Sequence, residues 1–307
     1  MRLVFVLLIL LRFQEEFVAG SVDFGLLKRN VINVPKNESR IPPKTTHFVI
    51  GGTQARAGVF PWQVYILFSA QFGPSLTSIC GGSLLSPRHI LTAAHCAVDM
   101  VAPSFVMVGS VDLEGVTPNT KWREVHTTIV HPNYNRFDDS HQNDIAVLEF
   151  SPPITYNADV KPVKFLQNDR VLLWKDGVVS GFGTFKHRPD YFGRQEKVVS
   201  RYLLYANVQF VHNDVCKTIY KNPWNQPIIS NAQVCAGAAG RGTSQGDSGG
   251  PIHIVHNGET FQVGLTSFGT AIVSDMYRQD KFPSVFTRIS SHCTFINRAS
   301  ENLARCM

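Results

Sequence analysis

The sequence predicts an all-β fold, either a barrel or a sandwich, that ends in one helix. The first observation is a series of short apolar runs rich in Val, Ile, Phe and Thr and bounded by Gly, Pro, Asn or Asp, a pattern typical of short strands. The second is that helical periodicity appears only near the end, in residues 292–305. The third is a composition of 44% apolar and 17% charged residues, which is typical of a folded domain and argues against disorder.

Residues 1–20 precede the strands and have the features of a secretory signal peptide. Arg2 gives a positive start, and the apolar run LVFVLLILL (3–11) is too short to span a bilayer. Small residues, Val18 and Gly20, follow at the positions that a signal peptidase recognises, so we expect cleavage near Gly20. No later apolar run reaches the length of a transmembrane helix. We therefore expect a secreted, extracellular protein without a membrane span.

Residues 21–48 carry little periodic structure and predict an extended pro-segment with an N-glycosylation sequon at Asn37. From Val49 onward the strand-like runs follow one another as far as the terminal helix, so we expect residues 49–307 to form the folded domain. The runs are WQVYILF (62–68), HILTAA (89–94), DIAVLEF (144–150), GVVSGFG (177–183), ANVQFV (206–211), GPIHIV (250–255) and FQVGLTSFG (261–269).

Charge and cysteine content narrow the range of partners. The formal net charge is +6, but no Lys/Arg block is dense enough for a nucleic-acid arm, so we expect a solvated basic surface and no nucleic-acid binding. All six cysteines lie beyond the signal peptide, on an oxidising route that favours disulfides. Six cysteines allow 15 pairings, and spacing alone does not choose among them. None forms the close pairs of a zinc knuckle, so we expect no metal site.

Three separated motifs carry the candidate chemistry. LTAAHC places His95 directly before a cysteine, NDIAVLEF places Asp144 before an apolar strand, and GDSGGP places Ser248 among glycines. This order of histidine, aspartate and serine, together with FPWQV at 60–64 and PSVFTRIS at 283–290, resembles the chymotrypsin-like (trypsin-fold) secreted serine protease family.

The resemblance extends from about residue 49 to about residue 300. It implies two antiparallel six-stranded β-barrels with the active site in the cleft between them. The first barrel would span about 49–160 and the second about 161–290, followed by a short C-terminal helix at about 291–304. The resemblance implies no cofactor and no metal ion.

The chemistry of the family is acyl transfer, and the resemblance gives each motif residue a role. A serine hydroxyl needs a base to take its proton as it attacks, and His95 would be that base for Ser248. Asp144 would hold the imidazole in the tautomer that faces the serine. The backbone N–H groups of Gly246 and Ser248 would form the oxyanion hole. The other histidines show no metal-ligand spacing, and we expect no catalytic role for them.

The resemblance also implies two disulfides, Cys80–Cys96 and Cys216–Cys235, and leaves Cys293 and Cys306 to pair by elimination. A continuous helix would separate these last two by about 20 Å at ~1.5 Å per residue, too far for a disulfide. Either the chain turns back after a short helix or the two thiols stay apart.

The first substrate pocket of the family is characterised by the residue six positions before the nucleophile, here Gly242. Relatives that cleave after Arg or Lys have an aspartate there. A buried cation without a partner is costly, so we expect uncharged side chains in the pocket and a chymotrypsin- or elastase-like preference. Asp275 or Asp280, in the long 270–282 loop, would change this preference by reaching into the pocket. The expected pocket residues are Gly242, Thr243, Ser267, Phe268, Gly269 and Ser284.

Activation is expected to follow cleavage after Phe48, because the first residue of the family's mature chain corresponds to Val49. The new α-amino group would pair with the acid before the nucleophile, Asp247, since a buried carboxylate without a cation is costly. The implied partners are protein or peptide substrates, protein inhibitors, and an activating protease that cuts after aromatic residues. Self-processing is the alternative to a separate activating protease.

Two functions are compatible with the sequence. The first is a secreted, zymogen-type serine endopeptidase that works through an acyl-enzyme. The second is a non-catalytic serine protease homologue that acts as a binding or regulatory protein. The unusual phenylalanine at the activation junction favours the second function, whereas the complete set of His95, Asp144 and Ser248, with GDSGGP intact, favours the first.

Overall fold

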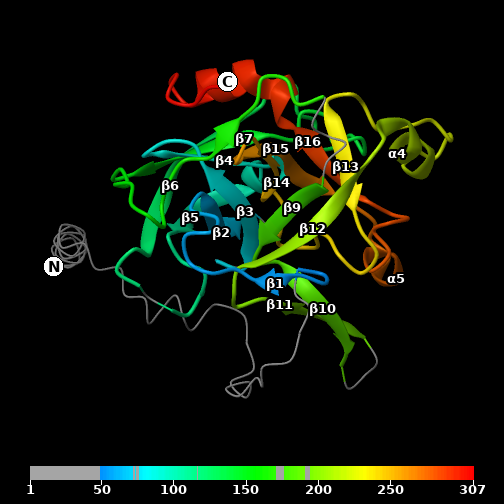
Figure 1. Ribbon diagram of the computed structural model, residues 1–307, viewed down its shortest axis with the longest axis horizontal. Coiled ribbons are helices and arrows are strands. Elements are labelled where there is room, and N and C mark those ends of the chain that lie inside the picture. Colours follow the sequence, from blue (N-terminus) through cyan, green and yellow to red (C-terminus); the bar gives the residue numbers. More distant parts are fainter. Residues whose placement is uncertain (1–48, 72, 74–75, 116, 171–175, 191–193) are drawn as a thin grey trace, which may run out of the picture. The chain divides into compact units, whose positions relative to one another are not determined.

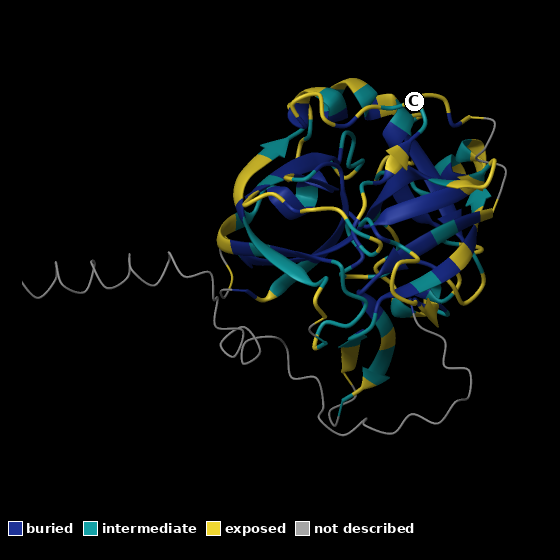
Figure 2. Ribbon diagram, turned by 60° about the vertical axis from the view of Figure 1, so that its left-hand side comes forward, coloured by how far each residue is buried: buried dark blue, intermediate teal, exposed yellow. Residues whose placement is uncertain are grey.

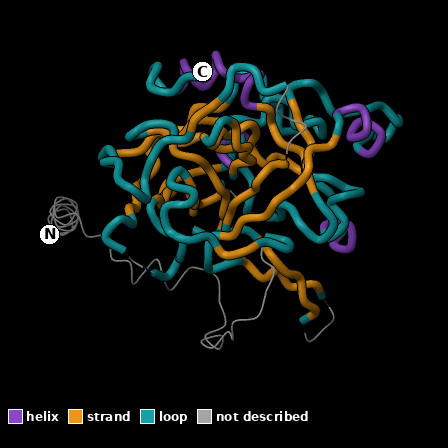
Figure 3. The backbone as a smooth tube through the Cα atoms, in the orientation of Figure 1, coloured by secondary structure: helices purple, strands orange, loops and turns teal. Residues whose placement is uncertain are grey.

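The computed structural model describes residues 49–307, apart from residues 72, 74–75, 116, 171–175 and 191–193 (Figure 1). The expected signal peptide (1–20) and pro-segment (21–48) lie outside the described residues. Strands dominate the described part of the chain, and its helices are short (Figure 3). Within these residues, every helix falls short of the length and apolar character that a membrane crossing requires.

The first barrel is a closed ring of six antiparallel strands in the hydrogen-bonding order β2-β3-β4-β7-β6-β5. Alternate residues of its first strand, Val64, Ile66 and Phe68, belong to one buried core cluster, as the two-residue period of a strand requires. The six strands are β2 (Gln63–Ala70), β3 (Ser78–Leu84), β4 (His89–Thr92), β5 (Met100–Val108), β6 (Lys121–Val130) and β7 (Ala146–Ser151).

The second barrel also closes, because β12 pairs with β13 on one side and with β9 on the other. Its interior is formed by a separate apolar cluster that includes Val179, Val208 and Ile252. The six strands of the ring are β9 (Asp176–Gly181), β12 (Leu204–Val211), β13 (Gln233–Gly237), β16 (Ser284–Arg288), β15 (Glu259–Phe268) and β14 (Pro251–His256). The predicted all-β fold with two six-stranded antiparallel barrels is therefore confirmed.

Four short strands lie outside the two rings. Strand β1 (Thr53–Gln54) pairs with β12, and β8 (Lys164–Phe165) pairs in parallel with β15. Strands β10 (Thr184–Pro189) and β11 (Gln195–Val199) form a separate antiparallel hairpin. Strands β1 and β8 thus extend the sheet of the second barrel, whereas the β10–β11 hairpin is a sheet of its own.

The C-terminal helix is shorter than the periodicity predicts. It ends at Ala299, and the chain then turns so that Cys306 forms a disulfide with Cys293 at a Cα separation of 5.8 Å. A helix continued to residue 304 would carry the two cysteines too far apart for this bond. The helical segments of the described chain are α3 (Ala94–Ala97), α4 (Asn213–Ile219), α5 (Val273–Met276), the 3₁₀ turn η2 (Ile289–His292) and α6 (Cys293–Ala299).

The two barrels meet through a third apolar cluster. It joins Leu91 and Ile145 of the first barrel to Leu265 and Ile289 of the second. Hydrogen bonds also cross between the barrels, for example from Ser180 Oγ to Gln63 Oε1 at 2.7 Å and from Trp62 Nε1 to His253 Nε2 at 2.6 Å. Most barrel strands are largely buried, with β6 the more exposed exception, and many exposed residues lie in the loops and on the last helix (Figure 2). This packing fixes the position of the loops that face each other across the barrels.

Candidate active site

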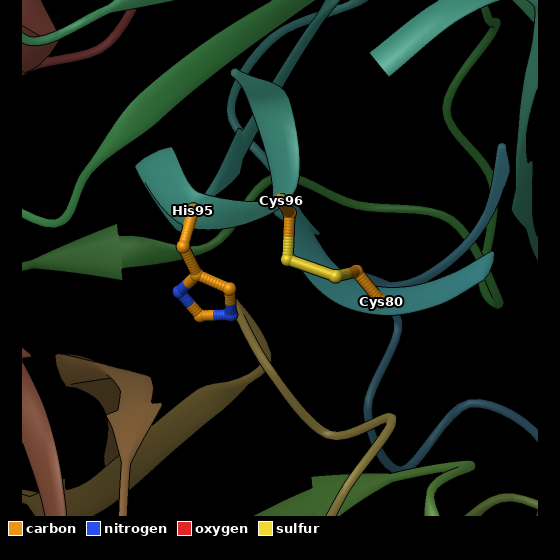
Figure 4. A group of neighbouring side chains, drawn as sticks. All are labelled: Cys80, His95 and Cys96. Carbon is orange, nitrogen blue, oxygen red and sulfur yellow. A yellow bond between two sulfur atoms is a disulfide. The ribbon is translucent and has the colours of Figure 1, made fainter. Parts of the chain in front are cut away.

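His95 lies on the short helix α3, directly after strand β4 of the first barrel. The preceding Ala93 and Ala94 are fully buried, and their small side chains let the chain turn tightly against the core. A disulfide joins Cys96 of the helix to Cys80 of strand β3 and lies beside the imidazole (Figure 4). The helix that presents His95 is thus covalently tied to the barrel.

Asp144 lies just before strand β7 and binds His95 at two points. The backbone N–H of His95 donates to Oδ1 at 2.9 Å, and Nδ1 of the ring lies 2.8 Å from Oδ2. Because a carboxylate accepts the Nδ1–H bond, the Nε2 atom of a neutral ring remains the proton acceptor. The arrangement therefore fixes both the orientation of the imidazole and its tautomer.

Two residues of the second barrel also donate hydrogen bonds to Asp144. Ser267 Oγ donates to Asp144 Oδ2 at 2.6 Å, and Thr287 Oγ1 donates to the backbone carbonyl oxygen of Asp144 at 2.9 Å. Ser267 was expected only in the wall of the substrate pocket, and its contact with Asp144 carries no sequence signal. The aspartate is consequently held by groups from both barrels.

Burial and charge shift the pKa values of His95 and Asp144 in opposite directions. Burial alone would lower the pKa of His95, but the charge and hydrogen bond of Asp144 outweigh it and raise that pKa above its ordinary value. Burial would likewise raise the pKa of Asp144, but the charge of His95 and the hydrogen bonds from His95 and Ser267 hold it below its ordinary value. An imidazole of raised basicity beside an ionised carboxylate is suited to accept a proton.

Ser248 comes from the second barrel, in the loop between β13 and β14. Its carbonyl oxygen accepts a hydrogen bond from the Gly81 N–H at 2.7 Å, and the next residue, Gly249, donates to Thr266 O at 2.7 Å. The sulfur of Cys96 lies 3.8 Å from the same carbonyl oxygen of Ser248. The serine backbone is therefore fixed against the disulfide that carries the helix of His95.

The backbone around Ser248 needs glycine at Gly246, which has φ +93°. A Cβ there would lie 2.8 Å from Ile79 Cδ1 and 3.1 Å from Gly183 Cα, so a larger residue would displace the loop. Among the described residues, the N–H groups of Gly246 and Ser248 have no hydrogen-bond acceptor. Two free donors in one tight turn are able to bind a negatively charged oxygen.

Asp247, the residue before Ser248, is 1% exposed. Its carboxylate accepts two backbone hydrogen bonds, from Gly183 N–H and Ser244 N–H, both at 2.9 Å. No cationic side chain of the described residues bonds to it, and burial raises its pKa to about 6 despite the two hydrogen bonds. Val49 is also 1% exposed and belongs to the core cluster of the second barrel.

A cavity of about 200 Å³ opens beside Ser248. Its described lining includes five of the six expected pocket residues, all except Gly242, together with Ser248 itself. Those five are Thr243, Ser267, Phe268, Gly269 and Ser284. The polar and apolar residues are mixed, and apolar surface is added by Met276 and Phe282 from the loop that follows β15.

The side chain that covers Gly242 is that of Gln279, a residue that no sequence pattern indicated. Gln279 is 2% exposed; its Nε2 donates to Thr243 O at 2.7 Å and its Oε1 accepts from Ser284 Oγ at 2.8 Å. A Cβ on Gly242 would overlap the Gln279 carboxamide. The cavity therefore has a neutral amide where relatives that cleave after Arg or Lys have an aspartate.

The two loop acids that were candidates for the pocket are directed elsewhere. Asp275 Oδ1 lies 3.8 Å from Arg278 Nη1, and Asp280 Oδ2 lies 3.8 Å from Lys281 Nζ. Neither belongs to the described lining of the cavity. Within the described residues, the pocket carries no fixed negative charge.

Two groups of side chains among the described residues have metal-ligating atoms close together. The first consists of Cys80, His95 and Cys96 (Figure 4). Its two sulfurs are bonded to each other, so they are not available as thiolate ligands. The second consists of His95, His141 and Asp144, and its members are not linked covalently.

Comparison with known proteins agrees with this geometry. The family model described as Trypsin matches residues 49–296. The chain is 32% identical over 257 residues to the dog protein chymotrypsin-like elastase family member 1, covering 83% of this chain and 93% of that protein. It is 30% identical over 259 residues to the venom protease of the bumblebee Bombus pensylvanicus, covering 80% of this chain and 96% of that protein.

A longer relative matches over part of its length. The chain is 29% identical over 285 residues to the serine proteinase stubble of Drosophila melanogaster. This match covers 89% of the present chain but only 34% of the stubble protein, so the chain spans about a third of that relative.

Proposed function

Because the chain belongs to the trypsin family of serine proteases, we propose that it is a serine endopeptidase that cuts peptide bonds through an acyl-enzyme. The observation that carries this proposal is the buried Asp144 carboxylate, which binds Nδ1 of His95 at 2.8 Å and leaves Nε2 free as a base. A second observation is the anchoring of Ser248 beside the helix of His95.

The proposed reaction has two halves. In the first, Ser248 Oγ bonds to the substrate carbonyl carbon while its proton moves to His95 Nε2. The carbonyl oxygen becomes negative and binds the N–H groups of Gly246 and Ser248. His95 then gives the proton to the leaving nitrogen, the C–N bond breaks, and the acyl group stays on the serine.

In the second half, water replaces the amine. The oxygen of the water molecule attacks the acyl carbon while His95 takes a proton from that water. The ester bond to Ser248 breaks, and the serine oxygen recovers the proton from His95. Asp144 stays ionised throughout and stabilises the imidazolium at each step.

The pocket beside Ser248 supports a preference for uncharged side chains. Gln279 presents a neutral carboxamide, and Met276 and Phe282 add apolar surface, so a buried guanidinium or ammonium group would find no counter-charge there. We expect a chymotrypsin- or elastase-like preference for apolar residues that fit a cavity of about 200 Å³. Peptides with arginine or lysine at the cleavage position should be poor substrates.

A pair of substitutions tests the role of Gln279. Gly242→Asp alone should destabilise the protein and give no cleavage after Arg or Lys, because the new side chain overlaps the Gln279 carboxamide. Combining Gly242→Asp with Gln279→Ala removes this overlap but keeps the backbone strain that φ +151° at position 242 imposes on a side chain. Relative to Gly242→Asp alone, the double variant should cleave after Arg and Lys at least about tenfold faster, or by about 1.4 kcal/mol. A panel of peptides that differ only at the cleavage position measures both variants. Cleavage after Arg by the wild type would contradict the proposed pocket.

Secretion and zymogen activation complete the proposed function. A signal peptide at 1–20 and a pro-segment at 21–48 would precede the protease, and cleavage after Phe48 would free the amine of Val49. Asp247, whose carboxylate has no cationic partner among the described side chains, is the expected acceptor of that amine. N-terminal sequencing of the secreted, active protein tests this step, and a first residue other than Val49 would contradict it.

An activity-based probe separates the two functions that the sequence allows. The full chain, cut to begin at Val49, is treated with a fluorophosphonate, which reacts only with an activated serine. We expect the wild type to be labelled and Ser248→Ala to remain unlabelled. A folded, correctly cut wild type that takes no label would support the non-catalytic alternative, a binding or regulatory homologue.

A further inference from the structure

A pair of glutamines joins the segment before Asp144 to the second barrel. Gln142 lies in the connection between β6 and β7, two residues before Asp144, and Gln233 begins strand β13. The Nε2 atom of Gln142 donates to Gln233 Oε1 at 2.8 Å, across 91 positions of sequence. Neither glutamine belongs to the sequence motifs, and the acyl-transfer steps use neither side chain. Their place beside the candidate active site therefore needs its own explanation.

The two side-chain amides are fully hydrogen-bonded. Gln142 Nε2 also donates to Ile228 O at 3.1 Å, and Gln142 Oε1 accepts from Ser230 Oγ at 2.6 Å. Gln233 is 1% exposed; its Nε2 donates to Ser140 O at 2.8 Å, and its Oε1 accepts from the Ser230 N–H at 3.0 Å. Because the backbone partners are fixed donors or acceptors, only one orientation of each amide satisfies them. A satisfied network of this kind specifies one arrangement of the segments that it joins.

The backbone on both sides of Gln142 adopts a left-handed conformation. His141 has φ +46° and Asn143 has φ +58°. Residues with a side chain adopt this conformation rarely, and it persists only where the surrounding structure fixes it. The surrounding contacts here include the hydrogen bonds of Gln142 and the stacking of His141 on Phe268, with ring centres 5.2 Å apart and planes at 28°. The segment that leads to Asp144 thus depends on contacts with the second barrel.

The chain between Gln142 and Asp144 is too short to absorb a displacement. One residue separates them, and the Ile145 N–H donates back to the carbonyl oxygen of that residue, Asn143, at 2.8 Å. Consecutive Cα atoms are about 3.8 Å apart, so a shift of Gln142 reaches Asp144 through one tight turn. The carboxylate of Asp144 is 2.9 Å from the His95 backbone nitrogen and 2.8 Å from Nδ1 of its ring. A small displacement would lengthen both contacts.

We propose that Gln142 and Gln233 form an amide clamp between the barrels that positions Asp144 for its bonds with His95. Both glutamines are positioning residues, because in the described part of the chain neither side chain bonds to the reacting groups. Ser267 bonds the carboxylate itself, whereas the amide clamp holds the backbone that leads to it. The inference rests on the proposed protease function for its effect on cleavage, but its effect on the imidazole requires no cleavage.

A displaced Asp144 has a distinctive effect on the imidazole. Burial lowers the pKa of His95, but the charge and hydrogen bond of Asp144 outweigh it and raise that pKa. If Asp144 moves away, its attraction weakens and His95 titrates at lower pH. The ring of His141 also faces His95, with centres 6.2 Å apart, but burial lowers its pKa and keeps it neutral near pH 7. Loss of the amide clamp should therefore move the titration of His95 to lower pH.

Three methionine substitutions separate the amide clamp from a general effect on packing. Methionine is close to glutamine in length and adds no charge, but its side chain lacks the amide donors and acceptor. Gln142→Met and Gln233→Met each remove one half of the amide clamp. Gln209→Met is the matched control, because Gln209 is an exposed glutamine of strand β12. Thermal melting of each variant shows that it folds, and either half of the amide clamp tests the proposal if the other variant does not fold.

Titration of His95 tests the amide clamp without catalysis. NMR of histidine-labelled full chain carrying Ser248→Ala follows the imidazole, and His95→Gln assigns its signal. We expect His95 to titrate at lower pH when Gln142→Met or Gln233→Met is added, and at the same pH with Gln209→Met. An unchanged His95 titration in a cooperatively melting Gln142→Met or Gln233→Met variant would overturn the proposal.

Kinetics of the processed protein give a second readout. Gln142→Met and Gln233→Met should each lower kcat at least about tenfold and leave KM within about twofold, because they displace a catalytic group and not the substrate pocket. The double variant should lose no more than the weaker single variant, since both remove the same contact. A rise in KM with unchanged kcat would contradict the positioning role. If His95 shifts in these variants but the wild type cuts no peptide, the protease function fails and the amide clamp stands.

Discussion

Two buried aspartates in this protein have opposite surroundings. Asp144 is 0% exposed and accepts hydrogen bonds from the His95 backbone, the His95 ring and Ser267, and its pKa is lowered because the attraction of His95 outweighs burial. Asp247 is 1% exposed and accepts two backbone hydrogen bonds but no cation, and burial raises its pKa to about 6.

The difference shows that burial alone does not set the charge of a carboxylate. Both side chains are removed from water, and both accept at least two hydrogen bonds. Only Asp144 faces a group that becomes positive, and a nearby opposite charge favours the ionised form. Asp144 therefore has a neighbour that can carry a positive charge, whereas no cationic side chain of the described residues bonds to Asp247.

The largest effect should follow from removing the charge of Asp144. An amide in its place cannot accept the Nδ1–H bond in the same way, so the imidazole would adopt the wrong tautomer. We expect Asp144→Asn to lower kcat by about 10⁴-fold, the loss typical of such a change. Steady-state kinetics of the processed protein measure this. A variant that keeps a tenth of the wild-type rate would show that Asp144 does not orient His95.

The next effect concerns Asp247 in the uncut chain. A carboxyl whose pKa rises from 3.8 to about 6 on folding favours the folded state below pH 4 and loses this advantage as pH rises through 6. At about 1.36 kcal/mol per pKa unit, the loss amounts to about 3 kcal/mol. We expect the uncut wild type to lose about this much unfolding free energy between pH 4 and pH 7 relative to Asp247→Asn.

Urea unfolding at several pH values measures this change. The same comparison on protein cut to begin at Val49 is the control, since the new α-amino group should pair with the carboxylate and remove the dependence. Identical pH profiles for the uncut wild type and Asp247→Asn would show that folding does not raise the pKa of Asp247.

The smallest effect tests the contact that the second barrel makes with Asp144. Ser267→Ala removes a hydrogen bond to a charged group, worth about 1.5–3 kcal/mol. It should shift the acid limb of the rate profile, which follows protonation of His95, to higher pH, because an Asp144 carboxylate with one donor fewer attracts the imidazolium more strongly. Thr287→Val is the matched control. It removes a bond to the neutral backbone of Asp144 and should lower stability by about 1 kcal/mol without moving that limb.

The sequence was sufficient to predict the fold, whereas the catalytic roles assigned to His95, Asp144 and Ser248 stay predictions. Periodicity predicted strands, and three motifs in order implied two barrels and the set of His95, Asp144 and Ser248. The terminal helix was overpredicted because its periodicity continues past Ala299, whereas the disulfide to Cys306 forces the chain back. A covalent constraint of this kind overrides local propensity.

The remaining features of the site depend on contacts between distant positions. Gln279 reaches the floor of the pocket only because the loop after β15 folds over Gly242, and no local pattern in 270–282 encodes that path. Ser267 meets Asp144 across 123 positions of sequence. His141 had a local signal, since it stands three residues before the motif aspartate, but its stacking on Phe268 required the second barrel to be in place.

The bonds from Ser267 and Thr287 to Asp144 have a consequence for how this fold tolerates change. Asp144 belongs to the first barrel, but hydroxyl groups of the second barrel donate hydrogen bonds to it. The orientation of the His95 imidazole therefore depends on how the two barrels pack against each other. A substitution deep in the seam, such as one at Leu265, would reach the reacting atoms through a tilt of one half. The turnover rate would then fall before the protein unfolded, so the rate is a more sensitive measure of barrel packing than unfolding is.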